Sequence, residues 1–127
     1  MKRLTALCLC LLLLLPLPAL AQYVMDLANL ARGIGMADFR GRDFDNLADA
    51  QTVYVTRVSR LAGIRRQGAM LDRAIASSRG AVHFLQAMVR QNRVAMRALR
   101  VHGEALDEVI FLTTTNDGTA MLYVDDR

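Results

Sequence analysis

The segment from Ala81 to Val101 has the most regular pattern in this chain, and this pattern limits the folds that the chain can adopt. Apolar residues recur along it at helical spacings, namely Val82, Leu85, Val89, Met96 and Leu99. Asn92 stands where the stripe lacks an apolar residue. The pattern predicts one amphipathic helix over 81–101, ended by His102-Gly103. Because such a helix buries its apolar side only against another element, the chain must fold around a shared core.

The polar side of this predicted helix is almost entirely positive. At 100° per residue, its sector contains Arg79, His83, Gln86, Arg90, Arg93, Arg97 and Arg100. Within the helix, no acid lies four residues from these arginines to neutralise them. Between residues 57 and 102 there are ten arginines and one acid, Asp72, whereas the other acids lie on either side of this block.

Four of these arginines are the candidate binding residues of the chain. They are Arg90, Arg93, Arg97 and Arg100, whose guanidinium groups suit phosphates and carboxylates. The alternative is internal pairing with the acids that follow the helix, namely Glu104, Asp107, Glu108, Asp125 and Asp126.

Three strands and a second helix are predicted around this segment. Thr52 to Ser59 alternates β-branched and aromatic residues, which is typical of a strand. A helical pattern follows from Ile64 to about Ser78. Val109–Thr114 and Thr119–Val124 flank Asp117-Gly118, which favours a hairpin.

These elements predict a small single α+β domain over residues 51–127. We expect the order β-α-α-β-β and a three-stranded antiparallel sheet packed on two amphipathic helices. Residues 22–50 have a weaker pattern, which predicts a short helix followed by an irregular lead segment. Phe39 and Phe44 are expected to anchor this segment to the domain; alternatively, it is an arm that docks on a partner.

The first twenty-one residues have the pattern of a secretory signal peptide. Lys2 and Arg3 precede an apolar run from Leu4 to Leu15, and Ala19-Leu20-Ala21 matches a signal peptidase site. Cleavage between Ala21 and Gln22 is therefore predicted, with a periplasmic or secreted location. An uncleaved anchor is the alternative, but the run is shorter than the roughly twenty residues that cross a bilayer.

Removal of this segment changes the chemistry available to the chain. Cys8 and Cys10 leave with it, so the processed chain has no cysteine for disulfides, thiolate metal sites or nucleophilic catalysis. The net charge falls from +4 to about +2, because Lys2 and Arg3 are lost.

Two stretches resemble short exported bacterial proteins of unknown function. One contains VTRVSRLAG from Val55 to Gly63, and the other contains DGTAMLYVDD from Asp117 to Asp126, with the two predicted helices between them. The resemblance transfers no activity and no site residues.

Motifs for catalysis, metals and cofactors are weak in this sequence. His83 and His102 lie about five helical turns apart, which does not suit a shared metal. Thr113, Thr115 and Asp117 have part of the spacing of a calcium loop but lack its acids. We therefore expect no enzyme activity, no metal and no cofactor. A concave pocket that gathers His83 or His102 with two acids would reopen the question of catalysis.

The sequence predicts a small exported, non-enzymatic protein of the periplasm or cell envelope. In the first hypothesis it is a protein-interaction or structural module that uses the hairpin edge or residues 22–50. The alternative is a binder of anionic envelope surfaces, phospholipid or lipid A phosphates, through Arg90, Arg93, Arg97 and Arg100. A nucleic-acid partner is disfavoured, because no aromatic residues alternate with these arginines. We expect no membrane span after cleavage, and the oligomeric state stays open.

Overall fold

The computed structural model describes residues 24–39 and 41–127. The predicted signal peptide, Met1 to Ala21, and its cleavage site lie outside these ranges. Within them, no helix has the length and apolar character needed to cross a membrane.

The sheet has three strands in the order β1-β3-β2. Its strands are β1 (Thr52–Arg57), β2 (Val109–Thr114) and β3 (Thr119–Val124). The hairpin of β2 and β3 is antiparallel and lies at the predicted residues, with Gly118 at φ +87° in the turn. The structure therefore confirms the small α+β class and the hairpin.

The prediction of a fully antiparallel sheet was wrong, because β1 pairs with β3 in parallel. Thr52 lies opposite Thr119, and Arg57 lies opposite Val124. Inward and outward side chains alternate in both kinds of pairing, so the sequence pattern does not report strand direction. The long helical connection after β1 is what permits a parallel return.

The described chain has more helices than the three predicted, which were a short helix within 22–50 and two amphipathic helices. The observed helices are α2 (Leu27–Met36), α3 (Arg42–Ala48), α4 (Ile64–Ser77), α5 (Arg79–Arg90) and α6 (Arg93–His102). Of these, α3 forms where an irregular segment was expected. Two short 3-10 helices, η2 (Val58–Arg60) and η3 (Leu106–Glu108), follow β1 and precede β2.

The single helix predicted over 81–101 is two helices, α5 and α6, which meet at an elbow at Gln91 and Asn92. Asn92 has extended backbone angles, φ −103° and ψ 114°, and its side-chain oxygen accepts a hydrogen bond from the Ala95 N–H at 2.9 Å. This is the geometry of a helix N-cap. The polar residue that interrupts the apolar stripe therefore begins a new helix.

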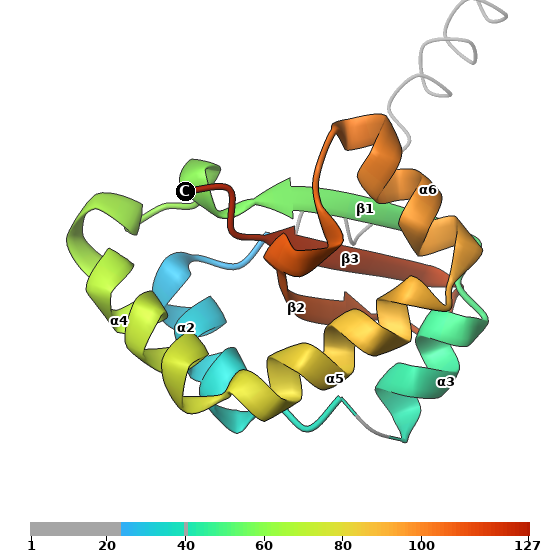
Figure 1. Ribbon diagram of the computed structural model, residues 1–127, viewed down its shortest axis with the longest axis horizontal. Coiled ribbons are helices and arrows are strands. Elements are labelled where there is room, and N and C mark those ends of the chain that lie inside the picture. The colour runs from blue at the N-terminus through green and yellow to red at the C-terminus, as the bar shows by residue number, and fades with distance from the viewer. Residues whose placement is uncertain (1–23, 40) are drawn as a thin grey trace, which may run out of the picture.

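The helices cover the sheet from both sides. In Figure 1, α5 lies along β2 and α6 along β1, while α2 packs on α4. On the α2 side, Phe111 of β2 contacts Phe39 and Tyr123, with ring centroids 5.6 and 6.0 Å away. Gly33 of α2 lies directly against the Phe111 ring.

The lead segment is part of this core rather than a separate arm. Leu27, Leu30 and Ile34 of α2 are buried with the sheet residues. Phe39 is 3% exposed and confirms the predicted anchor, but Phe44 on α3 is 46% exposed, so its assignment as an anchor was wrong. From α3, the side chain that reaches the core is that of Leu47, which is 1% exposed.

Candidate functional site

The four candidate arginines lie next to the elbow and along α6. Arg90 ends α5, and Arg93, Arg97 and Arg100 are spaced four and three residues apart on α6, on the side opposite the buried Ala95 and Leu99. All four are exposed. We call these four residues the arginine face.

The predicted basic sector is not continuous, because α5 and α6 are separate helices. Arg79, His83 and Gln86 belong to α5 alone. Gln86 is also engaged, since its side-chain amide donates to the backbone oxygens of Asp107 and Val109, both at 3.0 Å. Helical spacing places Arg93, Arg97 and Arg100 on one side of α6, whereas Arg90 ends α5, three residues before Arg93.

The arginine face is open in the part of the chain that the structure describes. None of its four side chains forms an ion pair or a hydrogen bond there. The guanidinium groups therefore face solvent with their donors available to a ligand.

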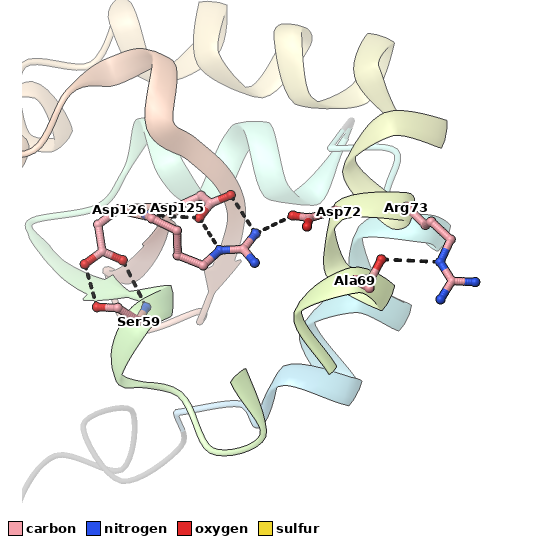
Figure 2. A network of polar contacts seen from close by, with 7 residues as sticks. Ser59, Ala69, Asp72, Arg73, Asp125 and Asp126 are labelled. Carbon is pink, nitrogen blue, oxygen red and sulfur yellow. Dashed lines mark hydrogen bonds and ion pairs between the residues drawn. The ribbon is translucent and has the colours of Figure 1, made fainter. Parts of the chain in front are cut away.

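Three of the five acids expected to neutralise this face, Glu104, Asp125 and Asp126, are bound by other residues. Glu104 pairs with Arg57, whose guanidinium group also donates to the backbone oxygen of His102 at 3.0 Å. Asp125 forms an ion pair with Arg127, with 2.8 Å between Asp125 Oδ1 and Arg127 Nε, and Arg127 Nη2 lies 2.5 Å from Asp72 Oδ1 on α4. Figure 2 shows Asp125 and Asp72 on either side of this guanidinium group.

Asp126 is held by η2 in the same network (Figure 2). Its two carboxylate oxygens accept from the Ser59 N–H at 2.9 Å and from the Ser59 hydroxyl at 2.6 Å. Partial burial acts to raise the pKa of Asp126, but these hydrogen bonds and nearby Arg57 bring it below its ordinary value. The ionised carboxylate of Asp126 therefore joins the segment after β3 to η2 and does not pair with the arginine face.

A groove of about 400 Å³ lies at the elbow, next to Arg93. Its lining residues come from α3, α5, the elbow and α6: Phe44, Leu47, Ala48, Met88, Gln91, Asn92, Arg93 and Val94. Asn92 holds the two walls together, because its side-chain amide donates to the Leu47 backbone oxygen at 2.8 Å. Sequence reasoning missed this groove, and the exposed Phe44 is the residue that belongs to it.

A second pocket, of about 390 Å³, gathers one histidine and three acids between α5 and η3. His83 lies there with Asp107, Glu108 and Asp125. Burial is the main cause that raises the pKa of Glu108, with the charges of Glu104 and Asp107 adding to it. Across the described ranges, however, no hydrogen bond joins His83 to a carboxylate. The pocket meets the condition that reopens the question of catalysis, although its histidine and carboxylates are not joined by hydrogen bonds in the described ranges.

The remaining candidates have structural roles or stand apart. Asp117 accepts from the hydroxyls of Thr115 and Thr119, so the weak calcium-loop pattern is the hairpin turn. His102 is exposed at the end of α6, where Gly103 takes the left-handed conformation at φ +68°. Among the residues described, no group of three histidine or carboxylate side chains is placed to hold a metal ion.

Comparisons with protein-family models, curated proteins and solved structures give no match for this chain.

Proposed function

We propose that this protein is a small non-enzymatic binding protein of the cell envelope and that its arginine face binds phosphate-bearing anionic surfaces. The observation that carries this proposal is the open state of the four arginines, while Glu104, Asp125 and Asp126 are engaged by other residues. A guanidinium group binds phosphate through two parallel hydrogen bonds, and several on one surface add their attraction. The location in the envelope rests on the signal-peptide pattern of residues 1–21.

Protein interaction is the second candidate, and one observation supports it. Among the described strands, β1 pairs only with β3 and forms an edge of the sheet that is half-buried along most of its length. An edge of this kind can accept a strand from a partner. The hairpin edge and the lead segment are less suitable surfaces for a partner. Residues 24–39 and 41–50 contribute to the core, and the first four residues of β2 are buried.

Binding to lipid vesicles tests the arginine face. The protein is exported with its own leader, recovered as the cell processes it and sedimented with vesicles of phosphatidylglycerol or of phosphatidylcholine. We expect binding only to the anionic vesicles and its loss in about 0.5 M salt, which screens exposed charges. Each arginine near such a surface contributes about 1 kcal/mol, so Arg93→Gln, Arg97→Gln and Arg100→Gln together should weaken binding by about a hundredfold.

A matched variant removes the same charge elsewhere. This triple variant combines Arg32→Gln, Arg65→Gln and Arg66→Gln, which replace exposed arginines of α2 and α4. We expect it to lose only a little binding. Equal losses in both triple variants would mean that overall charge, not the arginine face, drives binding. Binding to the anionic vesicles that persists in about 0.5 M salt would contradict an electrostatic role of the arginine face.

A further inference from the structure

The groove at the elbow combines apolar lining residues with one arginine, Arg93. Leu47 and Met88 are buried at its base, while Phe44 and Val94 are 46% and 39% exposed along its sides. Its volume of about 400 Å³ lies within the range of roughly 300–1,000 Å³ that is usual for small-molecule sites. The side-chain amide of Asn92 has partners at both its nitrogen and its oxygen, so it adds no unpaired polar group to the groove.

The charges around the groove favour an anion. Arg93 lines it, and Arg90 and Arg97 lie three residues before and four residues after Arg93. The groove also reaches the first turn of α6, where the helix dipole is positive. None of the described lining residues is acidic, although three acids adjoin the lining in the sequence. Asp43 and Asp45 flank Phe44, and Asp49 follows Ala48. Of these, Asp43 accepts a hydrogen bond from Thr114.

We infer that the groove binds a single acyl chain that carries an anionic headgroup. The chain lies between Phe44, Met88 and Val94, and the headgroup lies against Arg93 at the start of α6. Apolar burial supplies the attraction along the chain, and the guanidinium group selects the charge. This inference rests on the proposed function, because it names the kind of molecule that the arginine face meets.

A titration of the unaltered protein with monomeric dodecyl phosphate tests the inference. With methyl-13C methionine, nuclear magnetic resonance observes the groove through Met88, while Met36 and Met70 report exposed sites elsewhere. We expect the Met88 methyl signal to shift saturably below the micelle concentration and the other two to stay in place. Inorganic phosphate should produce no shift, because it has no chain to place in the groove.

Variants separate the chain from the headgroup. Ala48→Phe fills the groove from an exposed lining position and should abolish the Met88 shift, whereas Ala87→Phe at an exposed position of α5 outside the lining should not. Arg93→Gln should weaken dodecyl phosphate binding by about tenfold, as expected for a lost charge-assisted hydrogen bond. Arg65→Gln serves as its matched control.

The outcomes distinguish this inference from the proposed function. A Met88 signal that does not respond to dodecyl phosphate overturns the inference, and vesicle binding that still depends on Arg93, Arg97 and Arg100 then leaves the proposed function intact. Equal affinity for neutral dodecyl maltoside, with no effect of Arg93→Gln, also overturns the anionic assignment. A saturable Met88 response in a protein that does not bind anionic vesicles supports the groove and overturns the surface-binding function.

Discussion

Gly33 is the residue at which one added carbon has the clearest predicted cost. A Cβ atom there would lie 2.8 Å from the Cζ atom of Phe111, a ring already held between Phe39 and Tyr123. Gly35, two residues further along α2, has no atom within 4 Å of such a Cβ. The two glycines of one helix therefore differ in packing and not in backbone conformation.

Gly33→Ala is expected to lower the free energy of unfolding by about 1–3 kcal/mol, because the core around Phe111 has to shift. Gly35→Ala should instead raise it by up to about 1 kcal/mol, since alanine is the better helix former. Urea unfolding of both variants beside the parent protein measures the difference. Equal effects of the two substitutions would contradict the close approach of Gly33 to Phe111.

The phenol of Tyr123 links the sheet to the start of the described chain. Its oxygen accepts a hydrogen bond from the Met25 N–H at 3.2 Å, and the residue is fully buried. Burial raises the pKa of Tyr123 above its ordinary value of 10.0, although the bond from Met25 acts in the other direction. The folded state therefore holds the phenol proton more tightly than the unfolded chain does.

The free energy of unfolding should be insensitive to this group below about pH 10 and should fall as the pH rises further, because the unfolded chain then loses the phenol proton first. Few basic groups change their charge in this pH range, because arginines stay protonated and Lys2 is the only lysine in the sequence. Urea unfolding between about pH 8 and 11 measures the effect. Tyr123→Phe should cost about 1 kcal/mol at neutral pH and should show a weaker decline in base. An identical decline in both proteins would assign the effect to another group.

At the level of elements, the elbow depends on Asn92. The side chain of Asn92 caps α6 through Ala95 and also joins α6 to α3 through the Leu47 backbone oxygen. Asp26 provides a comparison, because it caps α2 through Asn29 at 2.9 Å, and its side chain makes no hydrogen bond to another helix within the described ranges. A comparison of the two residues therefore distinguishes the stabilisation from capping a helix from that of a hydrogen bond between helices.

Asn92→Ala is expected to cost about 2 kcal/mol, about half from the lost cap and half from the lost bond to Leu47. Asn92→Asp keeps an acceptor for the cap but has no donor for Leu47, so it should cost about 1 kcal/mol. Asp26→Ala should also cost about 1 kcal/mol. Chemical unfolding of the three variants measures these values, and an Asn92→Ala cost no larger than that of Asp26→Ala would argue against the bridge to α3.

Elements with local signals could be predicted from the sequence, whereas those that depend on distant contacts could not. Asp117-Gly118 marks the hairpin by turn geometry alone, and both of its strands begin and end where predicted. Asn92 carried a local signal, but within a long apolar stripe it was interpreted as a gap instead of a cap. The direction of β1 depends on how the intervening helices pack, which periodicity does not report.

The candidate site divides in the same way. The identities and spacing of Arg93, Arg97 and Arg100 follow from the sequence, because helical periodicity places them together. Their lack of intramolecular partners depends on where the acids after α6 fold, and the groove depends on the packing of α3 against the elbow. Phe39 and Phe44 have similar sequence surroundings, yet one is buried and the other lines the groove.

For the whole molecule, one core extends across both predicted segments. Leu30 and Ile34 from the lead pack in the same buried cluster as Leu85, Leu99 and the sheet. The division into a lead segment of 22–50 and a domain of 51–127 therefore does not separate two cores within the described residues.

A single cooperative transition is expected in differential scanning calorimetry, with equal calorimetric and van't Hoff enthalpies. A chain that lacks residues 22–50 should show no transition, because it loses the buried side chains of α2 and α3 and exposes their partners. Two separate transitions in the parent protein, or a stable fold of the shortened chain, would show that the lead contributes little to the core.

The parallel pairing of β1 with β3 also affects how this chain is made. Arg57 leaves the ribosome well before Thr119, and at about 5–20 residues per second the delay is roughly 3–12 s. The hairpin partner β2 cannot shorten that delay, since β3 lies between β1 and β2. During this interval residues 52–57 have no partner strand, so their backbone N–H and C=O groups are unpaired. We therefore expect the newborn chain to bind chaperones that recognise extended segments.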